Sequence, residues 1–131
     1  MMRTLFLQAP TFDGFDGGAG SRYQAKREIR SYWFPTWLAQ PAALIPGSKL
    51  VDAPPHSQSL ADVAPMARDF DQVVLHTSTP SFASDIKVAE ALKAVNPSLK
   101  VGLIGAKVAV QSEESLRDAP VVDWVARNEF D

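Results

Sequence analysis

The residues best suited to chemistry stand in one short turn, Thr77-Ser78-Thr79-Pro80-Ser81, between an apolar run and a helical pattern. Its hydroxyls and backbone amides could hold a polar or anionic ligand group. The same hydroxyls could instead cap the helix that follows. Because capping needs only one or two hydroxyls and Ser84 is placed for that role, the sequence favours a ligand role for this turn.

A glycine cluster and two histidines also invite chemical interpretations, and neither is supported. Gly17-Gly18-Ala19-Gly20 lies well beyond the first apolar run, and Tyr23 stands where a dinucleotide fingerprint has its third glycine. This cluster predicts a flexible or substrate-ordered loop. His76 closes an apolar run and is predicted to be a core-edge residue, while His56 lies in a distant loop. We therefore predict no metal site and no catalytic residues.

The composition is that of an ordinary globular domain. Of the 131 residues, 46% are hydrophobic and 21% are charged, and the formal net charge is −2, so nothing points to nucleic acid as a partner. No apolar run reaches the roughly 18–20 residues of a membrane span. Cysteine is absent, which excludes disulfides, thiolate zinc sites and iron–sulfur clusters in this chain and favours the cytoplasm.

Five apolar runs predict buried parallel strands separated by helical patterns. The predicted strands are Arg3–Gln8, Lys49–Asp52, Gln72–His76, Lys100–Ile104 and Val121–Ala126. The predicted helices are Thr36–Ile45, bent or broken by Pro41; Ser59–Phe70, capped by Ser57 or Ser59 and disturbed by Pro65; Ser84–Val95, capped by Ser84 and stopped by Asn96-Pro97; and Ser112–Arg117, capped by Ser112.

This alternation predicts a single α/β domain over residues 1–131, Rossmann-like or flavodoxin-like, with helices on both faces of a five-stranded parallel sheet. With right-handed crossovers, the commonest strand order is 2-1-3-4-5. Its switch point lies between the first and third strands, so the loops after Gln8 and His76 would flank a ligand crevice. The last strand is not followed by the usual helix, and we expect the chain to be the N-terminal part of a longer protein.

The connection over residues 9–35 is far longer than an ordinary loop, which is typical of functional or disordered segments. Its aromatic content argues against simple disorder. Arg22, Lys26 and Arg30 recur at every fourth residue and could contact a phosphate-bearing ligand or a neighbouring domain. A solvated helical face is an equally good interpretation of these basic residues.

Two families of this topology are disfavoured by the residues at the strand ends. A phosphoacceptor receiver needs acidic residues after its first strand and an aspartate after its third, where this chain has Gln8-Ala9-Pro10 and His76-Thr77-Ser78. A flavodoxin places a hydroxyl-rich phosphate loop directly after its first strand, whereas this loop begins Ala9-Pro10-Thr11-Phe12.

Several short motifs carry a resemblance through their order and spacing. They are Ala9-Pro10, Pro35-Thr36-Trp37-Leu38-Ala39, Lys49-Leu50-Val51-Asp52-Ala53, Leu75–Phe82, Asn96-Pro97, Gly102–Gly105 and Arg127-Asn128-Glu129. Together they resemble the N-terminal cobalamin-binding domain of B12-dependent radical SAM enzymes. Within that family, Gln8–Phe15 and Ser31–Pro35 look closest to the proteins associated with hopanoid biosynthesis.

The resemblance implies a Rossmann-like domain that holds cobalamin over the carboxyl end of its sheet. It implies cofactor contacts from Ala9, Pro10, Thr11, Phe12, Thr77, Ser78, Thr79, Pro80, Gly105, Ala106, Lys107, Asn128 and Glu129. It also implies a C-terminal radical SAM domain with a [4Fe-4S] cluster and S-adenosylmethionine. The parent enzyme would act in hopanoid side-chain biosynthesis, and this part would catalyse nothing by itself.

Two departures from the wider cobalamin-binding pattern qualify the cofactor's expected binding mode. The Asp-x-His-x-x-Gly motif is missing after the first strand, so cobalamin would have no protein histidine on its cobalt. Without cysteine, this chain cannot itself cleave S-adenosylmethionine. The alternative is a cofactor-free Rossmann-like module for docking or substrate recognition, which the aromatic and basic loop Phe12–Trp33 favours.

Overall fold

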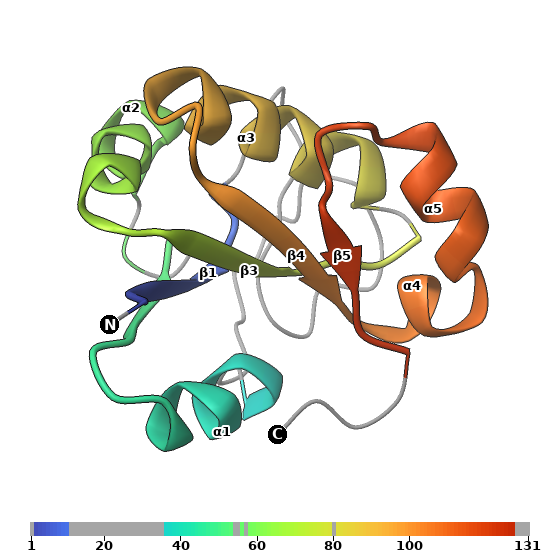
Figure 1. Ribbon diagram of the computed structural model, residues 1–131, viewed down its shortest axis with the longest axis horizontal. Coiled ribbons are helices and arrows are strands. Elements are labelled where there is room, and N and C mark those ends of the chain that lie inside the picture. Colours follow the sequence, from blue (N-terminus) through green and yellow to red (C-terminus); the bar gives the residue numbers. More distant parts are fainter. Residues whose placement is uncertain (1, 11–35, 54–55, 57, 80, 128–131) are drawn as a thin grey trace, which may run out of the picture.

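The computed structural model describes residues 2–10, 36–53, 56, 58–79 and 81–127, and its centre is an all-parallel sheet (Figure 1). The strands are β1 (Thr4–Gln8), β2 (Lys49–Asp52), β3 (Gln72–His76), β4 (Lys100–Ile104) and β5 (Trp124–Val125). They form a five-stranded sheet in the order β2-β1-β3-β4-β5. The predicted α/β class and strand order are therefore confirmed.

The last strand is shorter than predicted. The apolar run Val121–Ala126 contributes only Trp124 and Val125 to β5. The amide of Val122 donates to the carbonyl of Ala119 at 3.0 Å, which makes a turn. Val122 is buried and Val121 packs against the core from this turn, so hydrophobicity alone does not distinguish them from strand residues.

The helices are α1 (Thr36–Leu44), α2 (Leu60–Val63), α3 (Phe82–Val95), α4 (Ala106–Val110) and α5 (Ser112–Asp118), with a 3₁₀ helix η2 (Ala64–Asp69) after α2. α1 continues through Pro41 rather than breaking there. Pro65, at the start of η2, has no amide hydrogen to continue α2. The predicted helix Ser59–Phe70 is consequently split in two, and α4 was not predicted at all.

Two of the predicted helix caps are wrong. α3 begins at Phe82 with Ser81 as its N-cap, so Ser84 lies inside the helix. α5 has Gln111 as its N-cap, and Ser112 is its first residue. The cap at Ser59 is confirmed: its hydroxyl accepts from the amide of Asp62 at 3.3 Å, and the Asp62 carboxylate accepts from the Ser59 amide at 2.8 Å.

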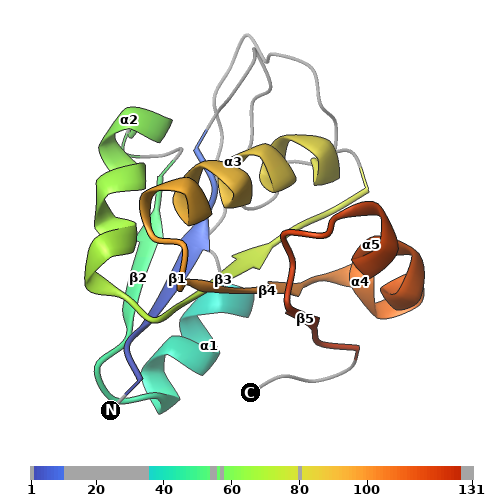
Figure 2. The same ribbon diagram turned by 45° about the horizontal axis from the view of Figure 1, so that its top comes forward.

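Helices cover both faces of the sheet, with α1 on one side and α3 on the other (Figures 1 and 2). The larger core joins α2, η2, α3 and one sheet face, and its buried side chains include Leu5, Leu7, Val73, Leu75, Val101 and Leu103. The smaller core, Phe6, Leu38, Val74 and Ile104, lies between α1 and the opposite face. Alternate residues of each strand thus face different helices, as expected of a parallel sheet buried on both sides.

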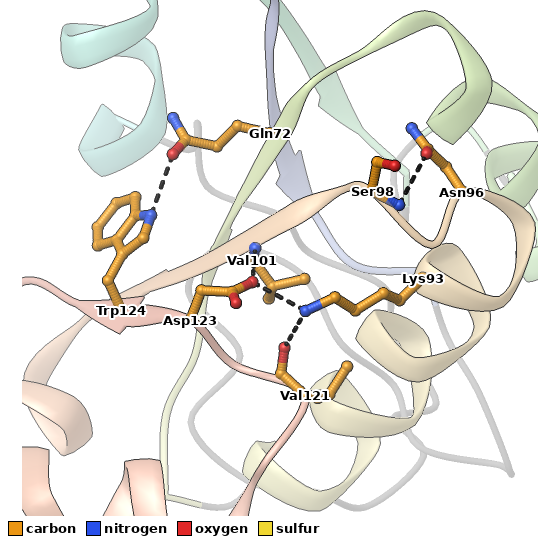
Figure 3. A network of polar contacts seen from close by, with 8 residues as sticks. All are labelled: Gln72, Lys93, Asn96, Ser98, Val101, Val121, Asp123 and Trp124. Carbon is orange, nitrogen blue, oxygen red and sulfur yellow. Dashed lines mark hydrogen bonds and ion pairs between the residues drawn. The ribbon is translucent and has the colours of Figure 1, made fainter.

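Polar side chains fasten β5 to the rest of the sheet (Figure 3). The Lys93 ammonium lies 2.9 Å from the Asp123 carboxylate and donates to the carbonyl of Val121 at 3.0 Å. The Asp123 carboxylate also accepts from the amide of Val101 at 2.8 Å. The approach to β5 is thereby held against both α3 and β4.

Trp124 fixes β5 on the α1 side of the sheet. Its indole lies over Gly102, its register partner on β4, and it occupies the space that a side chain there would need. The indole N–H donates to the Gln72 side chain at 3.0 Å, and Gln72 donates to the hydroxyl of Thr4 at 3.3 Å. A hydrogen-bonded line thus runs from β5 to β3 and β1 over the glycine of β4.

We expect Gly102→Ala to lower the free energy of unfolding by about 1–3 kcal/mol, the usual cost of overpacking, because its methyl group would collide with the indole of Trp124. Urea unfolding measures the change. In a Trp124→Ala background the same substitution should cost much less, since the collision is gone. Equal costs in both backgrounds would contradict this packing.

Candidate functional site

The carboxyl ends of the strands bring several predicted cofactor residues to one edge of the sheet. Ala9-Pro10 follows β1, Thr77–Thr79 follows β3, and Gly105–Lys107 follows β4. The amide of Thr77 donates to the carbonyl of Ile104 at 3.0 Å, which joins the ends of β3 and β4. The predicted residues Thr11, Phe12, Pro80, Asn128 and Glu129, and the side chain of Ala106, lie outside the described part of the chain.

Only part of this set presents side chains to a ligand. Ala9 and Pro10 are buried, and Ala9 belongs to the larger core, so its side chain packs inward. Thr79 is exposed and Ser78 is half-buried. Of the loop after β1, the described residues therefore offer backbone rather than side chains.

The hydroxyls of the turn after β3 are organised around a buried carboxylate. Thr77 and Ser81 both donate to the same oxygen of Asp85, at 2.7 and 2.8 Å. The hydroxyls of Ser78 and Ser81 lie 2.7 Å apart, and the Ser78 amide donates to Ser81 at 3.1 Å. Most of the turn's hydroxyls are thus bonded within the turn or to Asp85 of α3.

Burial governs the charge of Asp85, whose exposed fraction is 4%. Desolvation raises the pKa of its carboxyl group to about 7, and the hydrogen bonds from Thr77 and Ser81 oppose this shift without cancelling it. Near neutral pH the carboxyl group is therefore divided between its ionised and protonated forms. No sequence pattern marked it, because Asp85 looked like an ordinary first-turn aspartate.

Gly105 allows β3 and β4 to end side by side. Its φ of 122° is in the region that side chains rarely adopt, and a Cβ atom there would meet the carbonyl oxygen of Thr77. The nearest side-chain atom to that position is Nε2 of His76, at 3.4 Å. Gly105 was predicted as a cofactor contact, and the described contacts give it the role of admitting the turn after β3.

Lys107 places a cation at this edge. Its ammonium lies 4.6 Å from the centroid of the Phe82 ring and donates to the Gln111 side chain at 2.9 Å. Lys107 is half-buried, so a ligand could reach its charge. Among the described cofactor candidates it is the side chain suited to a phosphate or another anion.

Three polar residues at the ends of β1, β2 and β3 were not predicted as site residues. Gln8 pairs with Asp52 in the sheet register, and His76 follows the register pair Leu7 and Leu75. Burial lowers the pKa of the His76 imidazole, which is therefore neutral at pH 7. Alternation along each strand, combined with the register between the strands, places all three on one face.

The pH dependence of stability tests the buried state of Asp85. Because its folded-state pKa of about 7 exceeds the ordinary value of 3.8, the folded chain binds the proton more tightly than the unfolded chain. The free energy of unfolding should therefore fall between pH 3.8 and about 7, by on the order of 3 kcal/mol. Urea unfolding across this range measures the slope.

Asp85→Asn keeps an oxygen that accepts from Thr77 and Ser81 but does not titrate, so its profile should lose most of this fall, and the smaller slopes from Asp52 and His76 should remain. Asp62→Asn is the matched control. Hydrogen bonds from the Ser59 backbone and side chain lower the pKa of exposed Asp62, so its removal should leave the slope unchanged. An undiminished slope in Asp85→Asn would assign the titration to another group.

Two glycines with positive φ allow a matched test of the contact at Gly105. Gly105→Ala should cost at least about 3 kcal/mol, since it combines backbone strain with a collision. Gly47, with φ 77°, lies in an exposed turn, and Gly47→Ala should cost only about 1–2 kcal/mol for its backbone conformation. Similar costs in thermal or urea unfolding would argue against the close approach of Thr77.

The described residues contain no group of three or more His, Cys, Asp or Glu that could hold a metal ion. In the same part of the chain, no helix has the length and apolar character needed to cross a bilayer. No protein-family model matches the chain, and no curated protein or solved structure is significantly similar to it. The function must therefore be argued from the residues at the carboxyl edge of the sheet.

Proposed function

We propose that this chain is a cobalamin-binding accessory domain of a radical SAM enzyme, of the HpnJ type, that acts in hopanoid side-chain biosynthesis in the cytoplasm. The carrying observation is the switch point of the sheet, where the hydroxyl-bearing turn after β3 begins between the ends of β1 and β4 and is bonded to the end of β4. Open parallel sheets bind ligands at this position. The short motifs along the chain supply the identity of the ligand.

The described residues fit a large, mostly neutral cofactor with one anionic group. Ser78 and Thr79 provide reachable hydroxyls, and the backbone around Gly105 can approach a ligand closely. Lys107 provides a cation for the phosphate of the nucleotide tail. No histidine of this chain is assigned to the cobalt, since the residues after β1 include none.

The chain's own contribution to chemistry is positional. Bound cobalamin would supply the reactivity of its cobalt. The turns after β3 and β4 would orient the corrin, and the network around Asp85 keeps the first of these turns in one conformation. The radical step belongs to a C-terminal domain with a [4Fe-4S] cluster and S-adenosylmethionine, because this chain has no cysteine for a cluster.

A second function, cofactor-free docking, is favoured by a different observation. α1 exposes Trp37 and Leu44, with exposed fractions of 61% and 65%, and their separation of seven residues places both on one side of the helix. Exposed apolar side chains of this size often mark protein interaction sites. This function predicts no cofactor binding by the chain.

Titration with hydroxocobalamin separates the two functions. If the proposal is right, the corrin absorption changes saturably and the cofactor co-elutes with the chain on gel filtration. Lys107→Ala should weaken binding roughly tenfold, the usual loss for one charge-assisted hydrogen bond. An unchanged spectrum together with separate elution would refute cofactor binding and leave the docking function.

The control for this variant is Lys100→Ala. Lys100 is another lysine of the β4 region, but it is exposed and begins β4, so it lies at the opposite edge of the sheet. Its removal should leave the affinity for hydroxocobalamin unchanged. Equal losses in the two variants would show that the basic charge acts at long range, without a contact at Lys107.

A further inference from the structure

Gln8, Asp52 and His76 form one row across the carboxyl edge of the sheet, which we call the edge row. Gln8 is the register partner of Asp52, and His76 follows the β3 partner of Leu7. Adjacent strands lie about 4.8 Å apart, so the row spans about 10 Å. It crosses the boundary between β1 and β3, which is the switch point of this strand order.

All three side chains lie on the α1 face of the sheet. Phe6 and Val74, two residues earlier on β1 and β3, belong to the core beneath α1. Side chains two apart on a strand share a face, so Gln8 and His76 share the face of Phe6 and Val74. Register carries Asp52 to the same face as Gln8. The row is thus separate from the hydroxyl network around Asp85, which belongs to α3.

One member of the edge row has unmet hydrogen-bonding capacity. Oδ1 of Asp52 is buried and has no hydrogen-bond partner. Its register partner Gln8 is buried beside it, with an exposed fraction of 7%. Buried polar atoms in folded proteins are nearly always bonded to something. The Asp52 oxygen therefore indicates a partner that the described residues do not supply.

The charges of the row restrict what that partner can be. An ionised carboxylate only accepts hydrogen bonds, and burial raises the pKa of Asp52 while the nearby charge of His56 lowers it. His76 is neutral because burial lowers its pKa. Within the row the Asp52 carboxylate is the charged group, and it disfavours a phosphate there. A neutral donor such as a hydroxyl or carboxamide group would satisfy the buried oxygen of Asp52.

We propose that the edge row is a recognition site for neutral hydrogen-bond donors of the bound cofactor, either the ribose hydroxyls of its nucleotide tail or the carboxamides of its corrin ring. This inference rests on the proposed function, and it adds a second set of contacts between the chain and the cofactor. Lys107 lies beyond β4, at the other end of this edge. The row would therefore bind neutral donors of the ligand near β1 and β2, and Lys107 would bind its anionic group near β4. A ligand that carries both kinds of group would bind in one orientation.

The test compares Asp52→Asn with the unchanged chain, using hydroxocobalamin and dicyanocobinamide as probes. Cobinamide keeps the carboxamides of the corrin ring but lacks the nucleotide tail. Asp52→Asn should weaken hydroxocobalamin binding at least tenfold, since a charged acceptor is lost. A loss with hydroxocobalamin alone assigns the row to ribose hydroxyls, and a loss with both probes assigns it to carboxamides.

Stability provides the second readout. If the buried oxygen of Asp52 bonds only to a ligand, its charge does not stabilise the chain without cofactor. Asp52→Asn should then keep or raise the urea midpoint of the chain without cofactor. Gln8→Ala should likewise fold and bind hydroxocobalamin more weakly. The control is Asp118→Asn, an exposed carboxylate on α5, which should change neither quantity.

Two results would overturn the inference, and they are distinguishable. If the unchanged chain binds hydroxocobalamin and Asp52→Asn binds both probes equally well, the edge row does not read the cofactor while the proposed function stands. If the unchanged chain binds neither probe, the proposed function fails and the inference fails with it.

Discussion

The structure depends on a carboxylate that is taken out of water at the start of α3. Burying Asp85 is unfavourable unless its oxygens are bonded, and Thr77 and Ser81 donate to it from the turn that leaves β3. The turn therefore has one favourable path, close to the end of β4, where its backbone meets Ile104 and Gly105. The hydrogen bonds to Asp85 therefore hold this part of the carboxyl edge in place before any ligand binds.

Close packing also positions β5, on the α1 face of the sheet. Gly102 leaves room for the indole of Trp124, which then reaches Gln72 across β4. β5 has only two residues in the sheet, so its position relies on this indole and on Asp123 as much as on its backbone pairs. Two glycines of the β4 region thus leave room for neighbouring groups: Gly102 for the indole of Trp124 and Gly105 for the backbone of Thr77.

The sequence predicts the sheet well because its signal is long-range and hydrophobic. The bounds of β2, β3 and β4 follow directly from apolar runs, and the commonest order for five strands joined by right-handed crossovers is the one observed. Local polar choices were harder to predict. Ser81 stands at the N-cap of α3 without a capping bond from its side chain, and its hydroxyl donates to the buried carboxylate of Asp85 instead, which no local pattern predicts. Val121 failed as a strand residue because a turn can bury an apolar side chain as well as a strand can.

Part of the candidate site could be predicted from the sequence, and part depends on contacts that only the fold shows. The hydroxyl turn was visible in the sequence, but hydroxyls that already donate to Asp85 have less to offer a ligand. A ligand gains most from groups whose hydrogen bonds the fold leaves unmade. The buried oxygen of Asp52 is such a group, and Asp52 did not stand out in the sequence, because one polar residue at a strand end is ordinary. Its significance arises only when parallel pairing sets it beside Gln8 and on the same sheet edge as His76, so recognition there would depend on the sheet register rather than on any motif.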